Sequence, residues 1–77
     1  MTLVRELILP PLHRRPGPQA TVIAALRIEA EDDGFYLFRC DEAGAVVADT
    51  WHEDMKAAME QAESEFGVRP SDWTTAE

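Results

Sequence analysis

Hydrophobic side chains recur at helical spacing between residues 50 and 67, and steps of three and four place them on one face of a helix. The stripe consists of Trp51, Met55, Ala58, Met59, Ala62 and Phe66. Thr50 and Glu53 have the spacing of a capping box, in which a hydroxyl and a carboxylate satisfy free N–H groups of the first turn. Gly67 suits the left-handed residue that ends many helices. We therefore expect one amphipathic helix over residues 51–66.

The other segments alternate between strand-like and turn-like composition. Prolines and glycines interrupt the chain after its first hydrophobic run, and later glycines follow acidic residues in two turn-like positions. Val, Ile, Leu and aromatic residues alternate with polar ones between these turns, as in half-buried strands. The predicted segments are a strand over 1–9, a Pro-rich loop over 10–19, a β-meander over 20–49, the helix over 51–66 and a tail over 67–77.

The register of the meander depends on the turn that contains Asp33 and Gly34. A two-residue turn formed by Asp33 and Gly34 sets apolar side chains opposite charged ones. A three-residue turn instead gives one face that is apolar throughout, and a slip of one residue would turn every side chain to the wrong side. We prefer the three-residue turn, which pairs Ala30 with Tyr36, Ile28 with Phe38 and Leu26 with Cys40.

The predicted fold is α+β in class: a single domain with a three- or four-stranded antiparallel β-meander and one C-terminal α-helix packed on one face. One helix cannot cover both faces of the sheet. In the preferred register the second face is half apolar, and such patches often mark interaction sites. The predicted interaction surface on this face consists of Ile23, Phe35, Leu37 and Val47.

The net charge of −8 indicates which partners are favoured, because it is unevenly distributed over the 77 residues. Residues 1–28 hold four arginines and one glutamate, whereas residues 29–77 hold fourteen carboxylates and three cations. An acidic body repels a phosphate backbone, so we expect a protein partner, or a second copy in a dimer, and no nucleic acid. The one basic cluster, at His13, Arg14 and Arg15, is a candidate contact for an acidic group; its two arginines belong to the predicted interaction surface.

The cysteine count favours a cytoplasmic protein. Cys40 is the only cysteine, so no intramolecular disulfide forms, and a domain of this size in an oxidising compartment would usually carry several. The apolar run Leu7–Leu9 is too short for a signal-peptide core, and no segment has the length of a membrane span.

Candidate catalytic chemistry is sparse. His13 and His52 have no cysteine or histidine at ligand spacing, so we predict no metal site, and no glycine-rich loop suggests a cofactor. The preferred register buries Cys40 inside the core, where a thiol behaves as a small hydrophobe. We therefore predict no catalytic residues. A small enzyme that uses Cys40 or His52 remains an alternative.

Residues 20–66 resemble the HicB-like antitoxin domain. The matching features are the turn Asp33-Gly34-Phe35-Tyr36, the following strand, and Asp49-Thr50 ahead of a helix with Glu53, Ala57-Ala58 and Gln61-Ala62-Glu63. The resemblance implies a β-meander with one helix that neutralises a small toxin ribonuclease. The stretch from Glu65 to Trp73 is also similar to the end of small bacterial proteins of unknown function.

Two hypotheses of function follow. The first is a non-enzymatic protein–protein interaction module that binds another protein, or a second copy, through the second sheet face or a strand edge. The second, which the resemblance implies, is an antitoxin-like inhibitor of a small basic ribonuclease.

Overall fold

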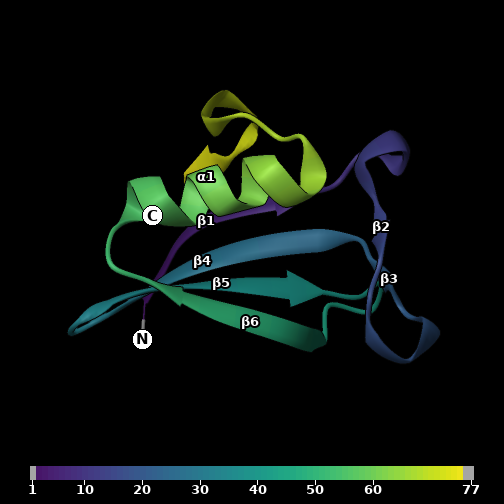
Figure 1. Ribbon diagram of the computed structural model, residues 1–77, viewed down its shortest axis with the longest axis horizontal. Helices are drawn as coiled ribbons and strands as arrows, with labels where there is room; N and C mark the ends of the chain where they lie inside the picture. Colours follow the sequence, from purple (N-terminus) through teal and green to yellow (C-terminus); the bar gives the residue numbers. More distant parts are fainter. Residues whose placement is uncertain (1, 76–77) are drawn as a thin grey trace.

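The computed structural model describes residues 2–75, which form a five-stranded antiparallel sheet with one helix on one of its faces (Figure 1). The strand order is β6-β5-β4-β1-β7. The strands are β1 (Thr2–Ile8), β4 (Ala25–Glu31), β5 (Gly34–Cys40), β6 (Val46–His52) and β7 (Thr74–Thr75), and the helix is α1 (Met55–Phe66). This architecture confirms the α+β class.

The sheet has more strands than the meander because both ends of the chain join it. β1 pairs with β4 on one side and with β7 on the other. The predicted strand over 1–9 and tail over 67–77 reach beyond the described residues, at Met1 and at residues 76–77.

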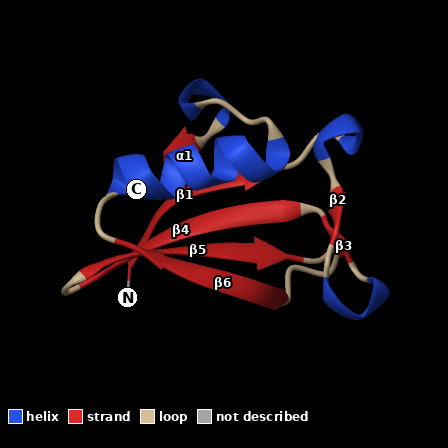
Figure 2. Ribbon diagram, in the orientation of Figure 1, coloured by secondary structure: helices blue, strands red, loops and turns tan. Residues whose placement is uncertain are grey.

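The predicted loop over 10–19 contains regular structure and forms an arm at one end of the sheet (Figure 2). The arm consists of the 3₁₀ turns η1 (Pro11–His13) and η2 (Pro18–Ala20) and the two-stranded sheet of β2 (Arg15–Pro16) and β3 (Val22–Ile23). A third 3₁₀ turn, η3 (Pro70–Asp72), precedes β7. The His13 ring holds the arm against the helix, because its Nδ1 lies 2.9 Å from the carbonyl oxygen of Phe66.

The helix begins at Met55, so the predicted start at residue 51 and the cap at Thr50 are wrong. Asp54 is the N-cap, and its carboxylate accepts a hydrogen bond of 2.8 Å from the N–H of Ala57. Thr50 lies in β6, which continues its pairing with β5 as far as His52. Strand pairing therefore delays the helix. Its end is as predicted: Gly67 has φ 72° and donates its N–H to the carbonyl of Glu63.

The preferred register of β4 and β5 is wrong by one residue. Glu31 pairs with Gly34, so the turn consists of Asp32 and Asp33 alone. Ile28 consequently lies opposite Leu37, and Leu26 lies opposite Arg39. The face under the helix need not be apolar throughout, because an ion pair accommodates the charged side chain of Arg39 on that side of the sheet.

The core fills the space between the sheet and α1. Its buried members are Leu7, Leu9, Ile23, Leu26, Ile28, Leu37, Ala58, Ala62, Phe66, Val68 and Trp73. The helix stripe is confirmed from Met55 onward, since Ala58, Ala62 and Phe66 are buried and the two methionines pack against them. Three residues that the preferred register or the helix stripe places in the core lie elsewhere. Tyr36, Phe38 and Trp51 lie on strands with partly or largely exposed side chains.

Candidate functional site

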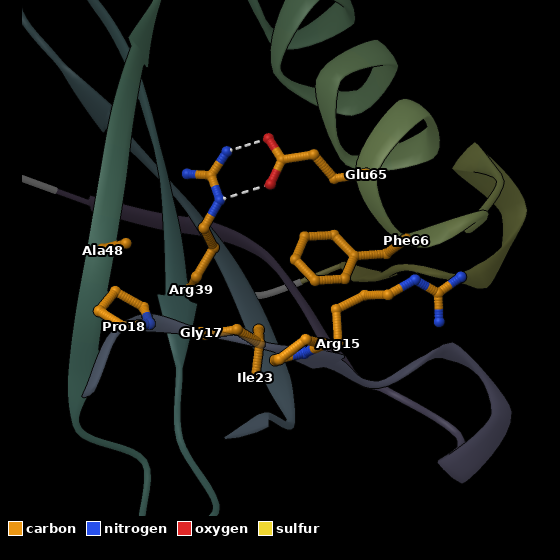
Figure 3. Close-up of a pocket in the computed structure, with 9 residues that line it drawn as sticks. Arg15, Gly17, Pro18, Ile23, Arg39, Ala48, Glu65 and Phe66 are labelled. Carbon is orange, nitrogen blue, oxygen red and sulfur yellow. Dashed lines mark hydrogen bonds and ion pairs between the residues drawn. The ribbon is translucent and has the colours of Figure 1, made fainter. Parts of the chain in front are cut away.

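A cavity of about 500 Å³ lies between α1, the sheet and the arm (Figure 3). It is lined by Arg15, Pro16, Gly17, Pro18, Ile23, Arg39, Ala48, Glu65 and Phe66. Figure 3 shows Arg39 reaching from β5 toward Glu65 on α1, above the ring of Phe66. The wall of the cavity contains the buried guanidinium of Arg39.

Arg39 makes four hydrogen bonds within the protein. Its Nε donates to Oε1 of Glu65 at 2.9 Å, and its Nη2 donates to Oε2 of the same carboxylate. Its Nη1 donates to the carbonyl of Leu37 at 3.2 Å and to Oγ1 of Thr50 at 3.1 Å. These hydrogen bonds lower the pKa of the Glu65 carboxyl, although burial acts in the opposite direction. Four of the five N–H donors of Arg39 are thus occupied and the residue is only 6% exposed, so the pair links helix to sheet with its two charges balanced.

His52 extends this network at the edge of the sheet. Its Nε2 lies 2.7 Å from Oγ1 of Thr50. Burial lowers the pKa of His52, Arg39 adds to that effect and Glu65 opposes it. A hydroxyl beside a neutral imidazole is half of a nucleophilic site, but such sites also need a group that orients the other ring nitrogen. Among residues 2–75, no such partner contacts Nδ1 of His52. The network joins β5, β6 and α1 through Arg39, Thr50, His52 and Glu65.

The face of the sheet opposite α1 carries a row of aromatic side chains. Tyr36 and Phe38 stack with ring centroids 5.9 Å apart and an interplanar angle of 21°. Trp51 on β6 pairs with Tyr36, and its side chain is 47% exposed. Ile8 and Val46, at 73% and 45% exposed, lie on β1 and β6 toward the other end of this face. We call the surface formed by Ile8, Tyr36, Phe38, Val46 and Trp51 the open face.

Gly34 positions the indole of Trp51 on the open face. A Cβ at Gly34 would lie 2.5 Å from Nε1 of Trp51 and 2.6 Å from the carbonyl oxygen of His52. Any larger residue would therefore displace the indole or the backbone of β6. Gly34 thus serves as a buried strand residue beneath Trp51, whereas the sequence pattern predicts a turn at this position.

Cys40 is buried as predicted, but it lies on the side of the open face. It is 1% exposed and pairs across the strands with Ala25 and Val46. Burial raises the pKa of the Cys40 thiol, and the nearby Arg27 guanidinium opposes this effect. A buried thiol with a raised pKa is a poor nucleophile at neutral pH.

The edge of the sheet next to the open face is available for pairing. β6 is hydrogen-bonded to β5, and no other strand within residues 2–75 pairs with it. Residues 41–54, which comprise β6 and the segments at its two ends, contain five carboxylates and no lysine or arginine. The carboxylates are Asp41, Glu42, Asp49, Glu53 and Asp54. The edge is therefore strongly acidic.

The apolar residues predicted for the interaction surface lie on the opposite side of the sheet from the open face or in the core. Ile23 and Leu37 are buried, at 3% and 0% exposed, and Phe35 and Val47 pack against the core under α1. Their placement on an uncovered face is wrong. The one-residue change in register inverts β5 and so turns Phe35 and Leu37 toward the core, whereas Ile23 on β3 and Val47 on β6 belong to or pack against the core. Arg14 and Arg15 bind loop carbonyls: Nε of Arg14 donates to Leu9, and Nη1 of Arg15 donates to Leu12. Their role in partner binding stays a prediction.

The register preferred from the sequence does not predict the residues of the open face. One signal in the sequence, a turn at Asp32-Asp33, indicates the correct register and therefore this face. This two-residue turn puts Leu37, the only leucine, isoleucine or valine of β5, opposite Ile28. That register also leaves Arg39 facing the helix, where Glu65 supplies a counter-charge.

The chain matches no family model, no curated protein sequence and no solved structure. The resemblance to the HicB-like antitoxin domain therefore stays a prediction. Within the described part of the chain, no helix has the length and apolar character needed to cross a membrane. The same residues bring together no group of three or more His, Cys, Asp or Glu side chains that could hold a metal ion.

Proposed function

We propose that this chain is a non-enzymatic protein-binding module that contacts its partner through the open face. The observation that carries the proposal is the exposure of Ile8, Val46 and Trp51 around the Tyr36–Phe38 stack. Antiparallel sheets often leave one face to solvent, but that face is then mostly polar. Arg27, Glu29 and Asp49 share the open face with its apolar and aromatic residues, since they pair with Tyr36 or Phe38. The exposed apolar and aromatic side chains beside them favour contact with another macromolecule.

The candidate nucleophiles favour binding over catalysis. Cys40 is buried with a raised pKa, and the Thr50–His52 pair has no orienting third group in the described residues. Arg39 is paired with Glu65. The aromatic side chains of the open face, by contrast, are of the types that dominate the energetics of protein interfaces.

A second candidate function is antitoxin-like inhibition of a small basic ribonuclease. The observation that favours it is the acidic stretch at residues 41–54 beside the open face, because a basic enzyme would be attracted to it. A small basic protein encoded next to this chain, whose ribonuclease activity falls when the two are mixed, would support this candidate. Unchanged activity in the mixture would count against it.

The proposed function is tested by affinity capture from the source cell with matched aspartate variants. Trp51→Asp and Ile8→Asp place a charge on the open face. Leu12→Asp is the control, because it introduces the same charge in the arm, at a position that is 91% exposed. We expect the captured protein to be lost with the first two variants and retained with the third. Equal capture by all three, with unchanged circular dichroism spectra, would refute the open face as the binding surface.

A further inference from the structure

We infer that the partner presents an extended basic segment, which adds as a new strand to the free edge of β6 and lays cationic side chains on Trp51. This inference rests on the proposed function and names the chemistry of the partner. Its components are the geometry of the edge, the side chains that β6 turns to the open face, and the charge around them.

The β6 edge has the length needed for strand addition. β6 spans seven residues, whereas β7 at the other edge of the sheet spans two. A shift in the β5–β6 register marks an irregularity near Val46, and pairing is regular from Ala48 to His52. An extended peptide that pairs with these residues satisfies its own backbone N–H and C=O groups, as in other cases of strand addition. The edge is therefore the natural continuation of the binding surface.

The side chains of β6 define what such a strand would meet. Trp51 and Asp49 pair with Tyr36 and Phe38, so they lie on the open face. Neighbouring positions on adjacent strands interact across about 5 Å. Side chains of an added strand that point to the open face would thus contact the indole of Trp51 and the carboxylate of Asp49. A guanidinium or ammonium group can bind both, by a cation–π contact and by an ion pair.

The charge of the edge selects a cationic segment. Residues 41–54 contain no lysine or arginine, and the cation of the adjacent strand, Arg39, is buried and paired with Glu65. An acidic or neutral strand would leave the carboxylates of this stretch without a counter-charge, and an acidic one would be repelled. A basic strand matches the exposed carboxylates at Asp49, Glu53 and Asp54.

The same charge disfavours a second copy as the occupant. Two antiparallel copies of β6 centred on Asp49 would bring the two Asp49 carboxylates together, since opposite residues in a strand pair are neighbours. Each copy also carries a net charge of −8. Charged side chains on an edge strand commonly prevent two copies from pairing, because like charges repel. A cationic strand is attracted by the same carboxylates.

The test uses synthetic peptides of the length of β6, seven residues, in which arginine alternates with valine. The control peptide has glutamate in place of each arginine. In a Trp73→Phe background, fluorescence reports on Trp51 alone, because Trp51 and Trp73 are the chain's two tryptophans. Amide hydrogen exchange, read residue by residue by NMR, reports on the backbone of β6.

We expect the arginine peptide to change Trp51 fluorescence saturably and to slow exchange of the β6 amides that face away from β5. Trp51→Leu should weaken binding about two- to thirtyfold, the range for a cation–π contact. Asp49→Asn with Glu53→Gln should weaken it about two- to tenfold, as for exposed ion pairs. Glu60→Gln with Glu63→Gln removes the same charge from the exposed side of α1 and should leave binding unchanged.

Three results would overturn the inference. They are equal binding of the glutamate peptide, binding of the arginine peptide without protection of β6, and protection of the β6 edge in a dimer of the protein alone. The last result would make a second copy the occupant. In each case the capture experiment with Trp51→Asp and Ile8→Asp still decides the proposed function, so the two failures are distinguishable.

Discussion

Arg39 on β5 and Glu65 on α1 form a bidentate ion pair across the interface between sheet and helix, with Nε of Arg39 2.9 Å from Oε1 of Glu65. The arginine side chain is 7% exposed and that of the glutamate 33% exposed. The pair therefore sits at the margin of the core and fixes the end of α1 over β5 and β6. It also explains how a charged residue occupies the helix side of a central strand.

Breaking this pair should destabilise the fold. Glu65→Ala leaves the buried guanidinium without its counter-charge, and we expect a loss of about 2–3 kcal/mol in the free energy of unfolding. The double variant Arg39→Met with Glu65→Leu should recover most of that loss, because no buried charge remains. Urea unfolding measures both changes. Glu63→Ala, on the exposed side of α1, is the control and should change stability by less than about 0.5 kcal/mol. A loss for Glu65→Ala no larger than that of the control would show that the pair contributes nothing.

Stability should fall in two steps as the pH is lowered. The pKa of His52 is lowered in the folded protein, so the unfolded chain binds a proton first, and stability declines as the pH falls below 6.5 toward the folded pKa. The pKa of Glu65 is also lowered, so its stabilisation is present above 4.5 and is lost as the pH falls through the folded pKa.

Urea titrations across this pH range check both steps. His52→Gln should remove the decline that begins near 6.5, and Glu65→Gln should reduce the decline below 4.5. A wild-type protein whose stability rises as the pH falls from 6.5 would contradict a lowered pKa for His52.

Gly34→Ala should disturb the open face. The added methyl group would lie 2.5 Å from Nε1 of Trp51 and 2.6 Å from a backbone carbonyl oxygen, which cannot move cheaply. We expect a loss of about 1–3 kcal/mol in stability and a changed Trp51 emission spectrum. Gly44→Ala is the comparison: its φ is 86° and the space around it is open. It should cost only about 1 kcal/mol through backbone strain and leave the emission unchanged. An unaltered spectrum in Gly34→Ala would mean that the indole does not lie over Gly34.

Cys40 should be nearly inert in the native state. Its thiol is 1% exposed and its pKa is raised, so alkylation at neutral pH should wait for local opening and run at least about tenfold slower than in the urea-unfolded chain. Mass spectrometry of iodoacetamide adducts over time measures the ratio. Equal rates in the two states would revive the interpretation of Cys40 as a nucleophile.

The features that the sequence predicted correctly depend on local signals. The α+β class, the buried stripe at Ala58, Ala62 and Phe66 and the helix end at Gly67 all follow from spacing within one or two turns of the chain. The residue at which the helix begins is decided by strand pairing as well as by the capping residues. Thr50 and Asp54 are both good caps, and the choice between them is made by pairing of His52 with Phe35, 17 positions earlier in the chain.

The candidate site depended on contacts that the sequence does not reveal directly. The predicted register assumed that Arg39 could not face the core, and it is accommodated only by Glu65, 26 residues away. Because of this assumption, the predicted register has the two faces of β5 the wrong way round. It places Leu37 on the surface and Phe38 in the core. The sequence predicts a half-apolar uncovered face, but the residues of β5 that it places there are those that lie under the helix. The pairing of β1 with β4 likewise joins segments separated by the whole Pro-rich arm.

Site-specific photo-crosslinking in the source cell tests the central claim most directly. A photoreactive phenylalanine analogue is placed at Trp51, on the open face beside the β6 edge, and in a control at Ser64, on the exposed side of α1. We predict a discrete adduct with another protein from position 51 and none from position 64. Adducts from position 64 with none from position 51 would contradict the assignment of the open face as the surface through which this protein binds its partner.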